Sequence, residues 1–208
     1  MIVTELKDST FVKSKIKVYI DDEYMFSLYK SDIKKLGLKV GGEISGERIS
    51  HIYEKILSKN ALDDAYRYLM RGDYTRKSLY EKLVRREIPE EIVESALEKI
   101  VEKGYVNDYE YAKKYIKDAM LKNKGKRYIE FELYKKGIEK DIISYILEDE
   151  DMGDKAYEIA EKKVLTILKG KDKPEIKDLR KVNDYLLRQG FSFDEVSGAI
   201  ERIKEMYE

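Results

Sequence analysis

The chain has 208 residues, of which 42% are hydrophobic and 40% charged, and its 42 basic side chains balance its 42 acidic ones. So high a charge content favours small modules with much exposed surface over one large domain. Cysteine is absent, which excludes disulfides and thiolate metal sites. The start, MIVTELKDST, lacks the features of a signal peptide, and apolar runs such as "IISYIL" (142–147) are too short to span a bilayer. We expect a cytoplasmic protein without membrane association.

The first part of the chain predicts a small β-containing element over residues 1–57. "KIKVYIDDEYMFSLY" (15–29) consists of two alternating β-prone runs around Asp21 and Asp22, which is typical of a hairpin. "SDIKKLG" (31–37) predicts a short helix that ends at glycine, and "KVGGEISGE" (39–47) predicts a turn-rich loop. After Ile49 the spacing of apolar residues becomes helical and stays so.

The helical part contains an apolar register that recurs at an offset of fifty residues and again, more loosely, at an offset of 53. The three copies are Leu79, Leu83, Ile88, Val93, Leu97; Ile129, Leu133, Ile138, Ile143, Leu147; and Val182, Leu186, Phe191, Val196, Ile200. Fixed spacing of this kind indicates a repeated structural unit. In each copy we expect a helix to begin after an N-cap residue, namely Thr75, Gly125 and Asp178.

Each copy is preceded by a further helix, and a short break within the copy separates its own helix from a third one. The preceding helices are predicted over Ala61 to Met70, Asp108 to Leu121 and Asp154 to Leu168, and Pro89 is expected at the first position of a following helix. The predicted fold is therefore mainly α, with three tandem three-helix, helix-turn-helix-like repeats in an elongated array after the β-containing element. The predicted repeats occupy residues 58–106, 107–152 and 153–208.

Charge is distributed unevenly over the second repeat and the start of the third. From Lys113 to Lys140 there are ten Lys or Arg residues against four acidic ones, a net charge of +6. From Asp141 to Glu161 there are eight acidic residues against one lysine, a net charge of −7. Adjacent blocks of opposite sign create a local field that can steer a charged partner, although both blocks can also be ordinary solvated helix faces.

Three stretches resemble the RecX family of recombinase regulators: "DYTRKSLYEKL" (73–83), "ALEKIVEKGYVNDYEYAKKYI" (96–116) and "KNKGKRYIEFELYKKGI" (122–138). The resemblance is specific over about residues 61–147 and only architectural beyond them. Departures are modest: Ser78 replaces an acidic capping residue, and Val106-Asn107 replaces a Leu-Asp pair. The resemblance implies a monomeric, non-enzymatic protein that docks in the groove of RecA filaments on single-stranded DNA. It would limit filament growth, ATPase activity and strand exchange during DNA repair and the SOS response.

Basic residues at predicted helix starts are the candidate contacts with the filament or its DNA, because backbone N–H groups there also attract phosphate. Solvated residues at exposed helix starts would have the same pattern. The candidates are Lys122, Lys124, Lys126 and Arg127, the corresponding Arg76 and Lys77, and Lys135 and Lys136 of the same basic block.

The sequence does not match the motifs of common enzyme and metal sites. "GGEISGE" has the glycine spacing of a phosphate loop, but Glu47 stands where lysine is needed. "EDEDMGD" (148–154) cannot be aligned with a calcium loop and is interpreted as an acidic linker. His51 is the only histidine, so a multi-histidine metal site is excluded. We therefore expect no catalytic residue, metal or cofactor.

Two other functions are compatible with the sequence. Tandem helix-turn-helix units could bind duplex DNA without RecA, in which case binding would be tight and salt-sensitive. A helical-repeat scaffold for another protein would show no dependence on DNA.

Overall fold

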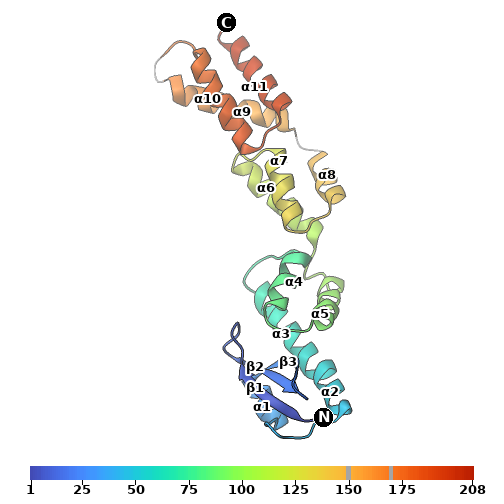
Figure 1. Cartoon of the computed structure of the whole chain (residues 1–208). Helices are drawn as coiled ribbons and strands as arrows, with labels where there is room; N and C mark the ends of the chain where they lie inside the picture. The colour runs from blue at the N-terminus through green and yellow to red at the C-terminus, as the bar shows by residue number, and fades with distance from the viewer. Residues whose placement is uncertain (149–150, 169–170) are drawn as a thin grey trace. The chain divides into compact units, whose positions relative to one another are not determined.

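The computed structural model describes residues 1–148, 151–168 and 171–208. The chain begins with a three-stranded sheet and is helical thereafter (Figure 1). It divides into two compact units, Met1–Asn107 and Asp108–Glu208. The mainly α fold class, with three-helix repeats after a small β element, is confirmed. The domain boundaries after residues 57, 106 and 152 stay predictions.

The sheet is antiparallel, with strands β1 (Val3–Asp8), β2 (Lys15–Ile20) and β3 (Glu23–Tyr29) in that order. Asp21 and Asp22 join β2 to β3 with φ angles of 48° and 69°. Two successive positive φ angles are typical of the tight turn that matches the twist of a hairpin, so the predicted hairpin is confirmed. Strand β1 was not predicted, because its sequence VTELKD carries charged residues on the exposed side and ends in two of them.

A continuous helical run leads from the sheet into the repeats. After α1 (Lys30–Leu36), which ends as predicted at left-handed Gly37, the chain forms α2 (Gly46–His51), a π-helical segment η1 (Ile52–Leu57) and α3 (Ser58–Leu69). Ile52 and Ser58, at the joints, both have right-handed helical backbone angles. The buried side chains of Ile52 and Leu57 belong to the hydrophobic core beneath the sheet. The predicted turn-rich loop therefore ends earlier than expected, at the N-cap Ser45.

The first three-helix module consists of α3, α4 (Arg76–Val84) and α5 (Glu90–Glu102). Thr75 caps α4 as predicted, because its hydroxyl accepts a hydrogen bond from the Ser78 amide. Pro89 is the N-cap of α5 and not its first helical residue, since its ψ of 137° is extended. The core contains the predicted register, within a cluster of Ala61, Ala65, Leu79, Leu83, Ile88, Val93, Ala96, Leu97, Ile100 and Val106.

The second module consists of α6 (Asp108–Leu121), α7 (Lys126–Lys135) and α8 (Lys140–Glu148), and the third of α9 (Met152–Leu168), α10 (Ile176–Gln189) and α11 (Phe193–Met206). The predicted register is buried in both modules, except that Ile200 is only partly buried. Gly125 is the N-cap of α7, as predicted.

Two predictions at the third module need correction or fall partly outside the structure. Asp178 is not an N-cap, because α10 begins at Ile176 and Asp178 is its third residue. The Asp178 carboxylate accepts a hydrogen bond from the backbone amide of the N-cap Glu175, as part of a capping box. The predicted acidic linker includes residues 149–150, which lie outside the described residues. Its last residues, from Met152 onward, already belong to α9.

Candidate partner interface

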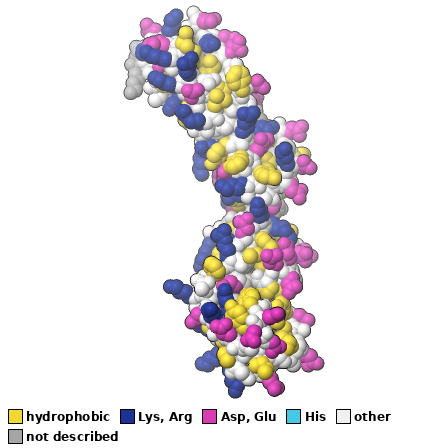
Figure 2. All heavy atoms as spheres, in the orientation of Figure 1, with side chains coloured by type: hydrophobic (Ala, Val, Ile, Leu, Met, Phe, Trp, Pro, Cys, Tyr) yellow, Lys and Arg dark blue, Asp and Glu magenta, His cyan; other side chains and the backbone are white. Residues whose placement is uncertain are grey.

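The structure distributes the predicted contact residues over two modules. Arg76 and Lys77 are the first residues of α4. Lys126 and Arg127 are the corresponding first residues of α7, and the turn before them contains Lys122 and Lys124. The remaining candidates, Lys135 and Lys136, are at the opposite end of α7. In the part of the chain that contains α6–α8, basic side chains lie beside hydrophobic ones on the surface (Figure 2).

Some candidate side chains already have partners within the chain. Arg76 forms an ion pair with Glu94 of α5, and both side chains are nearly half exposed. Such an exposed pair contributes only about 0–1 kcal/mol, so a partner can displace it at little cost. The Lys136 ammonium lies 5.6 Å from the centre of the Tyr111 ring and 6.0 Å from that of Tyr115. Burial raises the pKa of Tyr115 to about 12, so its hydroxyl stays neutral near pH 7.

Two backbone amides at the start of α7 are already hydrogen-bonded to the third module. The Gly125 amide donates to the Gln189 carbonyl at 2.9 Å, and the Arg127 amide donates to the Gly190 carbonyl at 3.0 Å. Gln189 is the last residue of α10, and Gly190 is its C-cap, just before the start of α11. These two amides are therefore not available to phosphate, because the third module already occupies them, while the basic side chains around them stay predicted contacts.

Lys124 also belongs to this contact between the second and third modules. Its ammonium donates to the Gln189 side-chain oxygen at 2.9 Å and lies 4.5 Å from the centre of the Tyr128 ring. Lys124 is thus engaged in packing within the chain.

Gly125 and Gly190 allow the two modules to approach this closely. A Cβ atom on Gly125 would lie 2.4 Å from the Phe191 nitrogen, and one on Gly190 would lie 2.6 Å from the Tyr128 Cβ. Gly190 also has a φ of 93°, which is costly for any residue with a side chain. The sequence identified Gly125 as a cap and gave no signal of this contact, because the two glycines are far apart in the chain.

The turn between the second and third helices has a left-handed residue at the same register in every module. These residues are Glu87, Gly137 and Gly190, with φ angles of 54°, 84° and 93°. Only the first carries a side chain, and left-handed backbone costs such a residue about 1–2 kcal/mol. Contacts of the Glu87 side chain must offset this cost.

Those contacts are with the sheet. The Glu87 carboxylate accepts a hydrogen bond from the Ser27 hydroxyl at 2.9 Å and forms an ion pair with Lys17 at 3.3 Å. Burial alone would raise the pKa of Glu87, but hydrogen bonds from Ser9, Ser27 and Lys17 outweigh it and lower the pKa. The carboxylate is therefore held in its charged form at the contact between the β element and the first module.

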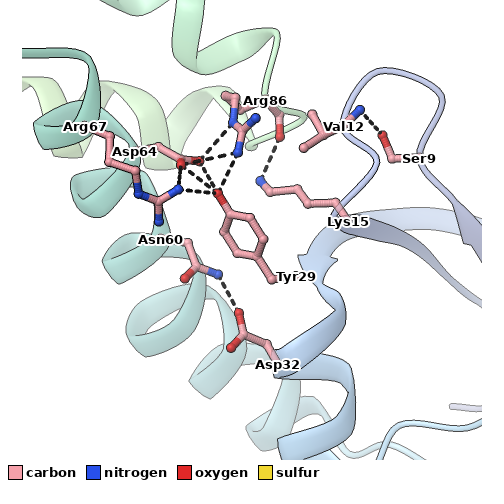
Figure 3. Close-up of polar contacts among 9 residues, drawn as sticks. All are labelled: Ser9, Val12, Lys15, Tyr29, Asp32, Asn60, Asp64, Arg67 and Arg86. Atoms are coloured by element: carbon pink, nitrogen blue, oxygen red, sulfur yellow. Dashed lines mark hydrogen bonds and ion pairs between the residues drawn. The ribbon is translucent and has the colours of Figure 1, made fainter. Parts of the chain in front are cut away.

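A second polar cluster completes this contact (Figure 3). Tyr29 projects from the end of β3 and donates to both oxygens of Asp64 on α3, at 2.6 and 2.8 Å. The Arg86 guanidinium bonds Asp64 at 3.2 Å and the Tyr29 hydroxyl at 2.8 Å. Asp64 is almost fully buried, so this pairing satisfies a charge that would otherwise be costly.

Lys15 is the most unusual member of the cluster. Its side chain is fully buried, and its ammonium donates to the Arg86 carbonyl at 2.7 Å and lies 5.0 Å from the centre of the Tyr29 ring. Burial lowers the pKa of Lys15 to about 8, against the attraction of Asp64. This contact could not be predicted from the sequence, because the alternation of residues 15–29 does not distinguish a buried lysine from an exposed one.

Other kinds of site find no support in the described residues. Within residues 1–148, 151–168 and 171–208, no three histidine, aspartate or glutamate side chains are grouped so that they could hold a metal ion. No helix in the same ranges is both long and apolar enough to cross a membrane.

Comparison with known proteins agrees with the resemblance in the sequence. Residues 61–99 match the family model of the first three-helix domain of RecX, and residues 107–146 match that of the second. The regulatory protein RecX of Caldanaerobacter subterraneus subsp. tengcongensis is 33% identical over 187 residues, which cover 90% of this chain and 92% of that protein. The regulatory protein RecX of Clostridium acetobutylicum is 31% identical, with 97% of this chain and 95% of that protein covered.

Solved structures extend the likeness to the third module and the β element. A crystal structure of regulatory protein RecX matches 98% of both chains, with a TM-score of 0.63 and 25% sequence identity. The structure of RecX from Lactobacillus salivarius matches 72% of this chain and 97% of its own, with a TM-score of 0.64 and 25% identity. Since a relative 33% identical is covered over nearly its whole length and both three-helix family models match in order, the chain belongs to the RecX family of regulatory proteins.

Proposed function

We propose that this protein is a non-enzymatic regulator of homologous recombination and DNA repair, which binds RecA filaments on single-stranded DNA and limits their growth. Membership of the RecX family over nearly the whole chain carries this proposal. A monomer would dock in the filament groove, in the cytoplasm, and lower both ATP hydrolysis and strand exchange by RecA.

The charge pattern supports a partner that is itself a protein–DNA complex. The protein has no net charge, but the net +6 block from Lys113 to Lys140 extends from within α6 through α7 to the first residue of α8. A local basic surface on a neutral protein attracts an anionic partner over short distances without strong general affinity for DNA. Duplex binding by a helix-turn-helix is less well supported, because α7 has two of its first N–H groups occupied by the third module.

The direct test is ATP hydrolysis by the cognate RecA on single-stranded DNA, with this protein titrated below and up to the RecA concentration. We expect hydrolysis to fall at substoichiometric ratios while the filaments shorten in electron micrographs. Unchanged hydrolysis with intact filaments would contradict the proposed function.

Charge reversal tests the candidate residues separately from the function. Lys122→Glu/Lys126→Glu should weaken inhibition about tenfold, because two contacts with an anionic partner are lost and repulsion is added. Lys124 is left unchanged, since its contact with Gln189 would confuse the result. The matched control, Lys55→Glu/Lys59→Glu, changes the charge equally at exposed residues of the first compact unit. Equal inhibition by the two variants would contradict the proposed contact site but not the proposed function.

A further inference from the structure

An apolar hollow of about 260 Å³ lies between α7 and α8 of the second module. Its lining includes Phe131, Tyr134 and Ile143, together with the charged side chains of Arg127, Glu130 and Lys140. Phe131 is 64% exposed and Tyr134 is 68% exposed. Large aromatic side chains give up much favourable burial when they face water, so this hollow has the character of an unfilled contact surface.

The size of the hollow limits what can fill it. Sites for cofactors and other small molecules usually measure about 300–1,000 Å³ and bury most of the ligand. This hollow is smaller and open to solvent, and its floor is formed by aromatic and aliphatic carbon. One apolar side chain that projects from a partner protein would fit both its size and its chemistry.

The charges at the edge of the hollow define the surroundings of that side chain. Among the described residues, neither the guanidinium of Arg127 nor the ammonium of Lys140 has an ion-pair or hydrogen-bond partner. Both belong to the net +6 block. A partner segment with carboxylates beside its apolar side chain would therefore complement the hollow in charge as well as in shape.

A nucleic acid fits the hollow less well than a protein. The lining is mostly aromatic and aliphatic carbon, against which a phosphate backbone would lose its hydration without gaining a partner. The amides of Gly125 and Arg127, which could have bound a phosphate at the start of α7, are occupied by carbonyls of the third module.

The same register in the first module carries different side chains at key positions of the lining. At an offset of fifty residues, Glu81 stands in place of Phe131, and Glu90 in place of Lys140. Glu94, which replaces Ser144, is paired with Arg76 across the two helices. The exposed phenylalanine and the lysine at the edge of the hollow are thus not repeated in the first module, although Lys77 corresponds to Arg127.

We propose that the hollow between α7 and α8 captures a single apolar side chain of the recombinase, aliphatic or aromatic, in a segment where carboxylates flank it. This inference rests on the proposed function and deepens it, since it names the chemistry of the recombinase surface that the second module recognises.

The test compares two double variants with the same change in composition. Phe131→Ala/Tyr134→Ala removes the lining, while the control Phe11→Ala/Tyr145→Ala removes a phenylalanine and a tyrosine of similar exposure, 79% and 66%, outside it. Affinity for RecA filaments on single-stranded DNA is measured by co-sedimentation. Loss of a central aromatic contact should weaken binding at least about tenfold, whereas the control should stay within about twofold of the unchanged protein.

A second pair of variants tests the charges. Arg127→Glu/Lys140→Glu reverses the edge of the hollow, and Lys113→Glu/Lys117→Glu makes the same charge change elsewhere in the basic block. The first pair should bind the filament at least about tenfold more weakly than the second, because its charges face the captured segment. Equal losses of affinity would mean that binding depends only on the overall electrostatic field of the basic block, and they would overturn the inference.

Binding of a single-stranded oligonucleotide without RecA separates protein from nucleic acid. Phe131→Ala/Tyr134→Ala should leave this binding unchanged. If it weakens oligonucleotide binding as much as filament binding, the hollow takes bases and the proposal is overturned. If the unchanged protein binds RecA filaments and the Phe131→Ala/Tyr134→Ala variant binds them equally well, the inference alone fails. If the unchanged protein does not bind them at all, the proposed function fails, and the inference fails with it.

Discussion

The turn between the second and third helices makes a tertiary contact in both the first and the third module, but by different means. In the first module, the Arg86 carbonyl accepts from the Lys15 ammonium, and the Glu87 carboxylate accepts from the Ser27 hydroxyl. In the third, carbonyls at the corresponding register, those of Gln189 and Gly190, accept from backbone amides at the start of α7. One turn is thus joined to the sheet by side chains and the other to α7 mainly by backbone.

This difference predicts how each contact can be broken. A contact between side chains has room to adjust but depends on charge and on pH, because its groups titrate. A contact between backbones has no titratable group, but it leaves no space for a Cβ atom. The first contact should therefore respond to changes of charge and the second to changes of volume.

The largest effect is expected from Gly125→Ala. The added Cβ would meet the Phe191 nitrogen at 2.4 Å and the Gly190 carbonyl carbon at 2.5 Å, and neither backbone atom can move aside alone. We expect a loss of more than about 3 kcal/mol in the free energy of unfolding, measured by urea denaturation followed by circular dichroism.

Gly198→Ala in α11 is the matched control for this prediction. Nothing lies within 4 Å of the position where its Cβ would be, so alanine should stabilise the helix by about 0.5–1 kcal/mol. Similar small effects of the two substitutions would contradict the close backbone contact.

A smaller loss is expected from Asp64→Asn at the first contact. The substitution preserves the volume but removes the charge that Arg86 and Tyr29 share. Hydrogen bonds to a charged group are each worth about 1.5–3 kcal/mol, and the amide keeps part of them, so we expect a loss of about 2 kcal/mol in the free energy of unfolding. Asp63→Asn, at the exposed neighbouring position, should change it by less than about 0.5 kcal/mol. Equal effects of the two substitutions would show that the cluster does not stabilise the fold.

The pH dependence of stability should distinguish the two contacts most finely. Lys15 has a pKa of about 8 in the folded protein, against an ordinary value of 10.5. Below pH 8 it is protonated in both states, so the cost of burying its charge is fully present. Between these pKa values the unfolded chain binds more protons, and the free energy of unfolding therefore rises with pH by at most about 1.4 kcal/mol per unit.

Lys15→Met should abolish this rise, while Lys13→Met, at an exposed position of the neighbouring loop, should preserve it. Urea denaturation at pH values from about 8 to 9.5 provides the measurement; above about pH 10 the titration of tyrosines intervenes. Burial raises the pKa of Tyr29, which opposes the rise there. An unchanged slope in Lys15→Met would refute the assignment.

Local sequence signals predicted much of the fold. The turn at Asp21 and Asp22 depends on two residues that can adopt positive φ angles, so a short stretch predicts it. The buried register of Leu79 and its repeats depends on helical spacing, which is also visible over a short stretch. One error arose at Asp178, because the helix begins after Glu175, a residue type that is not a preferred N-cap and that caps here through a capping box with Asp178.

The contacts that set the candidate site could not be predicted in this way. Lys15 and Arg86 are 71 residues apart, and Lys124 and Gln189 are 65 apart. Neither pair has a sequence pattern that distinguishes it from exposed polar residues. The sequence therefore identified the basic helix start but not that the third module occupies two of its amides.

The helical run from Gly46 through the π-helical segment to Leu69 has a mechanical consequence. A hydrogen-bonded helix resists bending and twisting far better than a loop, so a force on the sheet is transmitted along α2 and η1 to α3. Lys15, Tyr29 and Glu87 tie the sheet to the same module at a second place, which prevents rotation about the run. The β element and the first module should thus move as one rigid body, so that a force applied to either is transmitted to the other.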